Sequence, residues 1–439
     1  MGTRTGELRE IPGPKTKEWL NTAKKHLFTT TVESDIVIAR YDGPFVYDPD
    51  ENEYLDFASG VGVSSFGGGD GLRHLWNAVE ELKTNCGACG DIGSDWYNVP
   101  LIKAAEYIIP RIPLYGAENK IDFSTSGARA NEAALELGWA YWNSREDFNR
   151  KAIICFEGAF HGRTGYVKKF LDHRKPVRFR GYPNSSFTVL RAPFPEESVW
   201  DAKGKLENFF MKLPKILRRQ VSAVIMEVVQ GEGGIRVPDG KALQWWVETW
   251  RNENAFVIVD DVQAGVARTG RLMSYEHYDF KPDIVTIEKH FASGVPAAAM
   301  LGPAWADWTE HGRHAESFSG TPLIAAAAHA TLKHVLEYDV AKRNKKLGEF
   351  LRKELVLKLS SCSSVRRTRG IGLMHGVEFK SVEARDAAVK QAERMGLRTM
   401  GAGFAENPTI RIMPSFACNE EDIEQGVAIL KNAIEATEI

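Results

Sequence analysis

Four short runs of apolar residues in the middle of the chain lack the alternation of polar and apolar positions that marks a half-exposed strand. Each run is rich in Val and Ile and is short for a buried helix. A strand that helices cover on both faces has such a continuous apolar pattern. We therefore predict buried strands of a parallel sheet at 152–156, 221–229, 255–261 and 283–289.

Helical patterns separate these runs from about residue 72 onward, so that helix and strand alternate. This order is typical of an α/β fold with a mostly parallel central sheet. Before it, strand-like pieces at 36–39 and 45–47 predict an N-terminal arm with a small sheet. After it, the pattern predicts a C-terminal lobe of mixed helix and sheet, with helices at 323–338 and through residue 357 and strands at 370–379 and 409–413 flanking the segment 383–395.

The charge balance argues against nucleic acid and anionic membranes as partners. The chain has 56 basic and 58 acidic residues and a formal net charge of -2, so no excess field attracts a polyanion. No apolar stretch approaches membrane-spanning length, and the first residues lack the apolar core of a signal peptide. We expect a soluble, cytoplasmic protein whose partners are small molecules or its own copies.

The five cysteines favour reduced thiols over a disulfide framework. Only Cys86 and Cys89 are close in sequence, and an odd number in a long chain is unusual for a disulfide-rich protein. These two could form half of a zinc site or a redox pair, but no second pair accompanies them. We predict no metal site.

Charged residues stand near the carboxyl ends of three predicted strands: Glu227, Asp260 and Lys289. An isolated charge is costly to bury. The carboxyl ends of parallel strands share one edge of the sheet, where such folds bind ligands. The three charges therefore predict one site, and a structural ion pair between Asp260 and Lys289 is the alternative.

Ser126, Gly127 and Ala128 stand directly before a helical pattern. Ser126 is a plausible N-cap, and small residues would leave backbone N–H groups open at the positive end of the helix dipole. This combination predicts a phosphate-binding helix start, although ordinary helices also begin with Ser-Gly.

A short loop after the strand at 152–156 carries Phe160 and His161. Phe160 could stack on a planar cofactor, whereas the alternative is a core phenylalanine beside a structural histidine. With the helix start and the three charges, this loop completes a set suited to pyridoxal 5'-phosphate. Lys289 would form a Schiff base with the cofactor and move a proton at the substrate, and Asp260 would hold the pyridine nitrogen protonated.

These residues lie in a series of motifs that resembles the class III pyridoxal-phosphate-dependent aminotransferases, the family of 4-aminobutyrate, ornithine and acetylornithine aminotransferases. The resemblance runs nearly end to end. The motifs occur in the family's order and are Asp56-Phe-Ala-Ser-Gly-Val-Gly62, Ser126-Gly-Ala128, Phe160-His-Gly-Arg-Thr164, Gln230-Gly-Glu-Gly-Gly234, the segment 260–270, Lys289 and Arg369-Gly-Ile-Gly-Leu-Met374.

The resemblance implies the type I, aspartate-aminotransferase-like fold and a homodimer with shared active sites. A small domain would combine an N-terminal segment, 1–71, with the C-terminal segment 326–439, around a large cofactor-binding domain, 72–325. Gln263 matches the residue at the cofactor's phenolic oxygen, and Val262 the one packed on the ring face opposite Phe160. Ser317 stands where relatives place a threonine that reaches the neighbouring subunit's phosphate.

The resemblance also implies a substrate class. Arg411 matches an arginine that binds the alpha-carboxylate of glutamate or 2-oxoglutarate, Glu232 its switch partner, and Arg163 an arginine for a distal carboxylate. Together they favour transfer of an amino group from an omega-amino acid, of the 4-aminobutyrate or ornithine type, to 2-oxoglutarate. Alternatively, Arg411 is a surface residue on an edge strand and Arg163 pairs with Glu157 or a neighbouring helix.

Several positions depart from the family pattern. Arg129 replaces the usual glutamate after Ser-Gly-Ala, and Asp261 replaces the glutamate after the ring-nitrogen aspartate. His290 and Phe291 follow Lys289 where relatives are rich in glycine, and the segment 65–71 replaces a Gly-His-x-His-Pro turn. His290 could tune proton transfer or simply fill space.

Other activities use the same residues. Racemisation or epimerisation of amino acids on this fold would need a second acid opposite Lys289, which the sequence does not single out. A decarboxylating aminotransferase and a non-catalytic pyridoxal-phosphate-binding protein are further alternatives. Lys289 and Asp260 favour a catalyst.

Overall fold

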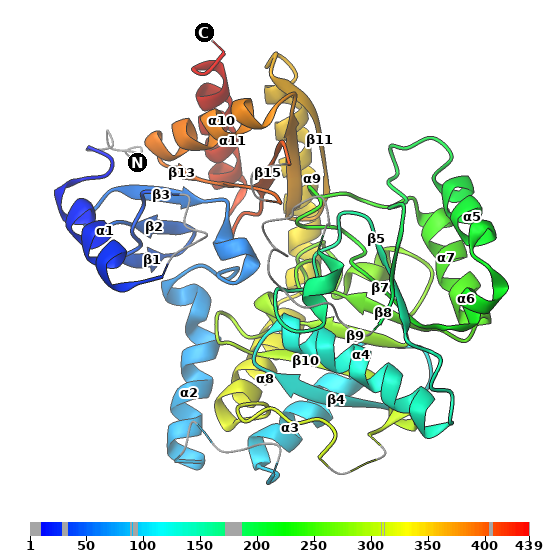
Figure 1. Ribbon diagram of the computed structural model, residues 1–439. Coiled ribbons are helices and arrows are strands. Elements are labelled where there is room, and N and C mark those ends of the chain that lie inside the picture. The colour runs from blue at the N-terminus through cyan, green and yellow to red at the C-terminus, as the bar shows by residue number, and fades with distance from the viewer. Residues whose placement is uncertain are drawn as a thin grey trace. The chain divides into compact units, whose positions relative to one another are not determined.

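The computed structural model describes residues 10–28, 34–87, 90, 95–171, 187–308, 310, 312–403 and 407–438. The chain forms two compact units (Figure 1). One combines both parts of the chain that lie outside the central segment, Met1–Arg73 and Asn344–Ile439, and the other is the continuous segment His74–Arg343.

The second unit is built on a seven-stranded sheet with the order β4-β10-β9-β8-β7-β5-β6. The strands from β9 to β6 pair in parallel, whereas β10 is antiparallel to both β9 and β4. All strands except β10 therefore end at one edge, and the predicted α/β fold with a mostly parallel sheet is confirmed. The strands are β4 (Asn119–Ser124), β5 (Ala152–Phe156), β6 (Val189–Ala192), β7 (Val221–Met226), β8 (Phe256–Asp260), β9 (Ile284–Ile287) and β10 (Ala298–Pro303).

The sequence located β5 to the residue but overextended the other three strands. The predicted strand at 221–229 ends at Met226, and those at 255–261 and 283–289 end at Asp260 and Ile287. Val228 and Val229 are buried although they follow β7. Burial continues into the loops at the carboxyl edge, so an apolar run does not show where the strand ends.

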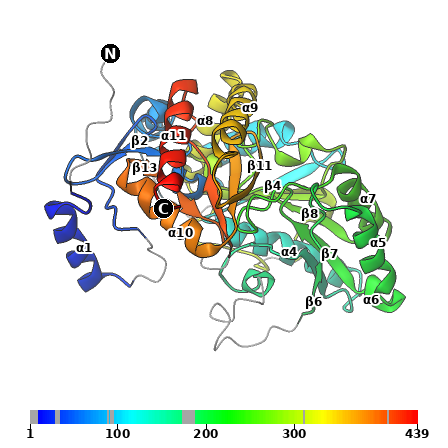
Figure 2. The ribbon, with the colours of Figure 1, turned by 90° about the horizontal axis from the view of Figure 1, so that it is seen from above.

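Helices cover both faces of this sheet. Alternate side chains of a strand point to opposite faces: Ile153 of β5 packs in the core beneath α4 (Gly127–Ser144), whereas the ring of Phe156 lies 5.4 Å from Trp246 of α7 (Gly240–Asn252). Figure 2 shows α5, α6 and α7 gathered together, apart from α4. The remaining helices are α2 (Arg73–Asn85), α3 (Val99–Ile108), α5 (Ala202–Lys212), α6 (Lys215–Arg219) and α8 (Pro322–Glu337).

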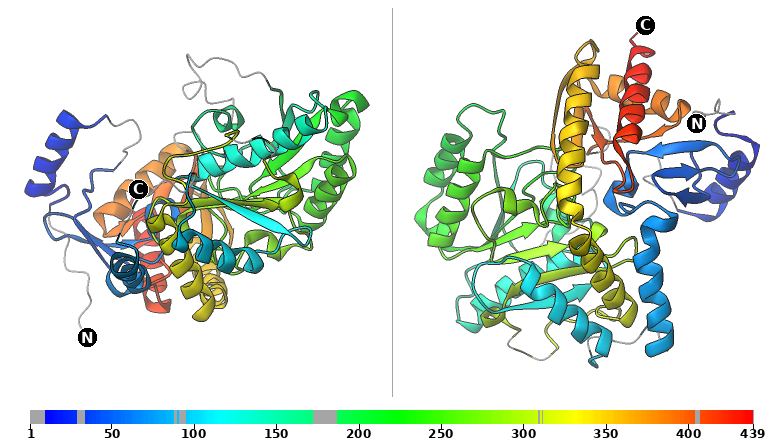
Figure 3. Two further views of the ribbon diagram at one scale, coloured as in Figure 1. Left: turned by 90° about the horizontal axis from the view of Figure 1, so that it is seen from below. Right: turned by 180° about the vertical axis from the view of Figure 1, so that it is seen from behind.

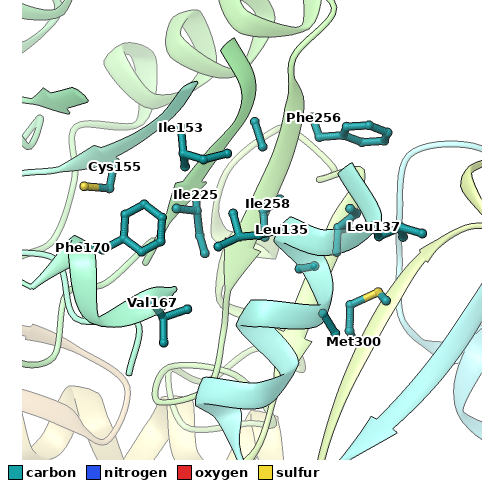
Figure 4. Close-up of a cluster of buried hydrophobic side chains, with 14 of the residues drawn as sticks. Leu135, Leu137, Ile153, Cys155, Val167, Phe170, Ile225, Phe256, Ile258 and Met300 are labelled. Carbon is teal, nitrogen blue, oxygen red and sulfur yellow. The ribbon is translucent and has the colours of Figure 1, made fainter. Parts of the chain in front are cut away.

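The core between α4 and the sheet fixes the position of this helix. Leu135 and Leu137 of α4 belong to one buried cluster with isoleucines from three neighbouring strands, Ile153, Ile225 and Ile258 (Figure 4). Burying each of these side chains contributes about 1.5–3 kcal/mol. The packing holds the first turn of α4 beside the carboxyl edge of the sheet.

The first unit contains two four-stranded sheets, β1-β2-β3-β13 and β11-β12-β15-β14 (Figure 3). Its strands are β1 (Arg40–Asp42), β2 (Phe45–Tyr47), β3 (Glu53–Asp56), β11 (Val365–Ile371), β12 (Met374–Phe379), β13 (Leu397–Arg398), β14 (Met400–Gly401) and β15 (Thr409–Ile412). Its helices are α1 (Pro14–His26), α10 (Val382–Arg394), α11 (Glu420–Glu435) and most of α9 (Val340–Leu359).

Two predictions in this unit were wrong. The strand predicted at 370–379 is two antiparallel strands, because β11 ends at Ile371, Gly372 turns the chain with φ 57°, and β12 begins at Met374. The piece at 36–39 is not a strand, because β1 begins only at Arg40. Ile38 is exposed, so its apolar side chain lies on the surface and not in a sheet-covered core. In the described part of the chain, every helix is too short or too polar to span a lipid bilayer.

Candidate active site

The three charges predicted to share a site lie at the same edge of the sheet. Asp260 is the last residue of β8, Glu227 directly follows β7, and Lys289 follows β9 after one intervening residue. These three strands are neighbours in the sheet. Lys289 adopts a left-handed backbone conformation with φ 49°, which is uncommon for a residue with a side chain.

The carboxylate of Asp260 accepts three hydrogen bonds. Asn131 Nδ2 lies 2.7 Å and His161 Nδ1 2.8 Å from Oδ2, and the backbone N–H of Val262 lies 3.1 Å from Oδ1. Asp260, Asn131 and His161 are all buried. These donors fix the position of the carboxylate at the end of β8. His161 is therefore a hydrogen-bond partner of Asp260.

Asn131 and Thr286 were missed by the sequence reasoning. Thr286 Oγ1 donates to Asn131 Oδ1 over 2.6 Å, which directs the amide NH2 of Asn131 toward Asp260 and the carbonyl oxygen of His161. A signal was present, because Thr286 is the one polar residue in the apolar strand β9. The role of Thr286 depends on β9 lying beside β8, and the sequence alone does not predict this strand order.

Asp261 turns away from Asp260. Its Oδ2 accepts the backbone N–H of Ser274 over 2.8 Å. Burial raises the pKa of Asp261 to about 7, with the hydrogen bonds from Ser274 opposing the rise and the charge of Asp260 adding to it. The two adjacent carboxylates therefore have different surroundings.

Glu227 joins two loops at the carboxyl edge. Its carboxylate accepts the backbone N–H of Phe160 over 2.9 Å and that of Gly231 over 3.1 Å. Burial raises its pKa to about 7, against the opposing effects of His161 and the two backbone N–H groups. Glu227 thus holds the loop that carries Phe160.

The start of α4 has a serine cap and a carboxylate on its first backbone N–H. Ser126 caps the helix by accepting the N–H of Arg129 over 3.4 Å, as predicted. The carboxylate of Glu288 accepts a hydrogen bond from the backbone of Gly127, and burial raises the pKa of Glu288 against the effects of Lys289 and this bond. Gly127 leaves little room, since a Cβ there would lie 2.7 Å from Val262 Cγ2.

The amide of Gln263 is buried, and its Oε1 has no hydrogen-bond partner within the described residues. His290 is also buried, and its Nε2 lies 3.0 Å from the backbone oxygen of Gln263. A carbonyl oxygen only accepts, so this nitrogen carries the proton. His290 therefore links the segment of Lys289 to that of Gln263.

The predicted substrate residues of this unit, and Ser317, which is predicted to contact a cofactor phosphate, lie on its loops. Arg163 is exposed, with its guanidinium carbon 5.4 Å from the ring centre of Phe160. Glu232 is half-buried in the loop after β7, and Ser317 is exposed in the loop before α8. Phe160, Arg163 and Glu232 thus all lie on loops that follow parallel strands.

Arg411 belongs to the other unit. It lies on β15, which has β12 on one side and β14 on the other, and it is buried, with its guanidinium donating to the backbone oxygen of Gly401 over 3.0 Å. The alternative of a surface arginine on an edge strand was therefore wrong.

The cysteines and acidic groups give no metal centre in the described part of the chain. Cys86 is exposed, and Cys89 lies outside the described residues. Among the residues that the structure describes, no group of three or more His, Cys, Asp or Glu side chains could hold a metal ion.

Comparison with known proteins identifies the family. A family model described as aminotransferase class-III matches residues 29–434. The chain belongs to the class III aminotransferases. This transaminase is 30% identical over 411 residues to the acetylornithine aminotransferase of Bacillus subtilis, covering 93% of this chain and 97% of that protein. It is 29% identical to the acetylornithine aminotransferase of Archaeoglobus fulgidus, covering 94% and 100%.

Solved structures support the fold of this class III aminotransferase. The ornithine aminotransferase of Toxoplasma gondii superimposes with a TM-score of 0.85 at 22% identity, over 98% of this chain and 97% of that one. A transaminase from Virgibacillus gives a TM-score of 0.87 at 19% identity, over 96% and 99%. The fold is the type I pyridoxal-phosphate architecture, and the cofactor of the family is pyridoxal 5'-phosphate.

The residues at the carboxyl edge fit this cofactor. The carboxylate of Glu288 on the N–H of Gly127 stands in for a phosphate oxygen at the helix start. The buried Oε1 of Gln263 has no partner among the described residues and is available to a cofactor oxygen that carries a proton. Asp260 is held by three donors at the end of β8. Arg129 and His290, which depart from the family pattern, do not displace Gly127, Gln263 or Asp260 from these positions.

Proposed function

We propose that this class III aminotransferase moves the amino group of an omega-amino acid, of the 4-aminobutyrate or ornithine type, to 2-oxoglutarate, with Lys289 holding pyridoxal phosphate as a Schiff base. One observation carries the proposal. Asp260 ends β8 and Lys289 lies just after β9. The two strands are neighbours, and both end at the edge of the sheet where α4 begins.

Each residue has a physical task in this proposal. Bound pyridoxal phosphate supplies an electron-accepting ring. Asp260 would hold the ring nitrogen in its protonated, charged form, because a carboxylate beside a cation favours the charged form. Phe160 and Val262 would enclose the ring, and the N–H groups of Gly127 and Ala128 would hold the phosphate.

Lys289 has two tasks. Its Nζ would hold the cofactor, and its free amine would move the proton of the substrate carbon that bears the amino group. A base fixed beside that carbon replaces a collision with solvent. The left-handed backbone at Lys289, with φ 49°, is the kind of uncommon conformation found at functional sites.

The substrate assignment rests on the relatives and on three side chains. Relatives of this chain include acetylornithine aminotransferases. Arg163 is exposed beside Phe160 and offers a planar guanidinium for a carboxylate far from the reacting amine. Arg411 would bind the alpha-carboxylate of glutamate or 2-oxoglutarate, with Glu232 as its partner when an omega-amino substrate is bound.

A homodimer with shared active sites is part of the proposal. Several large apolar side chains are exposed just before α3, at the start of α3 and in the loop before α8, and apolar surface of this kind marks interaction sites. Asn98 joins these segments by donating to the backbone oxygen of Gly320 over 2.9 Å. The loop also carries Ser317, the expected contact to the neighbouring subunit's phosphate. The exposed residues are Trp96, Tyr97, Val99, Ile102 and Phe318.

The decisive test uses purified protein loaded with pyridoxal phosphate. We expect a yellow protein that forms glutamate from 2-oxoglutarate and at least one donor in a panel including 4-aminobutyrate, ornithine and acetylornithine. The variant Lys289→Ala should lose both the colour and glutamate formation. Glutamate from no donor would refute the proposal, and rapid exchange of the alpha proton in deuterated water without any keto acid would favour a racemase.

A further inference from the structure

Three segments that carry proposed cofactor residues are joined at the first turn of α4. Thr164, on the loop of Phe160, donates to Glu132 Oε1 over 3.1 Å. Arg129 donates to the other oxygen of Glu132. Its Nε lies 4.0 Å from Glu316 Oε2.

Glu316 completes this chain of contacts. Its Oε1 accepts the backbone N–H of Thr125 over 3.1 Å as well as the hydroxyl of Thr125. Thr125 precedes the capping residue Ser126, and Glu316 precedes Ser317. One charged cluster therefore connects the loop after β5, the start of α4 and the loop before α8.

Arg129 is the cation beside the carboxylates of Glu132 and Glu316. The side chain of Glu132 is 3% exposed and that of Glu316 is 15% exposed, whereas Arg129 is 32% exposed. Without Arg129, two poorly hydrated carboxylates would face each other across the first turn of α4. Like charges in such surroundings repel strongly, so the loops would separate.

We propose that Arg129 is a positioning residue for the cofactor phosphate. It acts through Glu132 on the loop of Phe160 and through Glu316 on the loop that presents Ser317 to the phosphate of the neighbouring subunit. Its guanidinium is turned toward the carboxylates, so its effect on the phosphate passes through them. This inference rests on the proposed cofactor site and deepens it.

The first measurement is the equilibrium dissociation constant of pyridoxal phosphate, titrated into cofactor-free dimer. Arg129→Met should weaken binding at least about tenfold, and Arg129→Lys should restore it to within about threefold of wild type, because a cation between the carboxylates is regained. The matched control is Arg145→Met, at the far end of the same helix, where Arg145 is exposed over the ring of Tyr141. It should bind like wild type.

The second measurement separates positioning from direct contact. Glu316→Gln should weaken binding and shift the 31P resonance of the bound cofactor, and Arg129→Met in that background should weaken binding less than it does in wild type, because only the part that acts through Glu132 remains to be lost. If Arg129 contacted the phosphate itself, the two effects on the free energy of binding would add.

The outcomes distinguish this inference from the function on which it rests. Wild-type protein that binds no pyridoxal phosphate would refute the proposed site. Wild-type binding with unchanged affinity and 31P shift in Arg129→Met, or additive effects, would overturn the positioning role alone. Should Arg129→Met fail to fold, Glu316→Gln decides: unchanged affinity and 31P shift in that variant overturn the role.

Discussion

His161 Nδ1 lies 2.8 Å from Asp260 Oδ2, and both side chains are buried. Because Asn131 Nδ2 and the Val262 N–H also donate to Asp260, its oxygens act as acceptors and His161 is the donor. The other ring nitrogen, Nε2, is buried without a partner among the described residues. The imidazole of His161 thus donates to Asp260 through Nδ1.

We predict that His161→Ala lowers kcat/KM by about 10–100-fold, since a hydrogen bond to a charged group contributes about 1.5–3 kcal/mol. Thr286→Val, one bond further away, should lower it less than about tenfold. Steady-state kinetics checks both, with thermal unfolding to confirm the fold. A larger effect at Thr286 than at His161 would contradict this order.

Glu288→Gln should strengthen cofactor binding. The amide keeps an oxygen for the N–H of Gly127 but removes the charge that a phosphate dianion must displace. We expect a dissociation constant for pyridoxal phosphate about tenfold lower, or ~1.4 kcal/mol. Titration of cofactor-free protein measures it, with Glu248→Gln, on the exposed side of α7, as the control. Weaker binding in Glu288→Gln would show that the carboxylate supports the site.

A methyl group at Gly127 should damage the phosphate site. A Cβ there would lie 2.7 Å from Val262 Cγ2 and 2.9 Å from Glu288 Oε2, so Gly127→Ala should weaken cofactor binding. The control lies in the same helix: at Gly138 the nearest atom would be 3.4 Å away. Gly138→Ala should keep the affinity and stabilise the helix by up to about 1 kcal/mol. Equal affinities in both variants would contradict the tight fit.

The stability of the loop before α8 should depend on pH through His314. Hydrogen bonds to Asp122 and Glu136 raise the pKa of His314 from 6.5 to about 9. Because the folded-state pKa is the higher one, this stabilisation is complete below pH 6.5 and is lost as pH rises through about 9.

His314→Gln should therefore lower the free energy of unfolding by roughly 1–2 kcal/mol at pH 6 and by much less at pH 9.5. This loss of stability is smaller than the pKa shift of His314 alone would give, because Asp122 and Glu136 are partly exposed and solvent screens their charges. Thermal unfolding of wild type and variant across this range measures it. A constant difference at all pH values would exclude the histidine's charge as the cause.

The sequence predicted which strands end in charges, but not what surrounds those charges. The three charges lie at the carboxyl ends of β7, β8 and β9 as expected, because apolar runs identify buried strands. They are Glu227, Asp260 and Lys289. The contact between Thr286 and Asn131 joins residues 155 positions apart. The packing of α4 on β9 brings them together, and this packing is a property of the whole fold.

Side-chain direction was equally out of reach. The sequence marked Arg129 as a departure from the family pattern, but it did not show that Arg129 turns toward Glu132 and Glu316. It offered two roles for His290, and the bond to Gln263 supports a structural link. It did not mark Glu288, because a glutamate after an apolar strand is unremarkable until the start of α4 lies beside it.

The pairing of β3 with β13 has a consequence for synthesis. Arg398 of β13 binds Asp56, 342 positions earlier in the chain, over 3.2 Å, and Leu397 pairs with Leu55. A growing chain on the ribosome must therefore carry its first sheet with one strand missing while the 342 positions from Asp56 to Arg398 are made. Such an open edge invites wrong pairing, so the nascent chain is vulnerable until β13 has emerged.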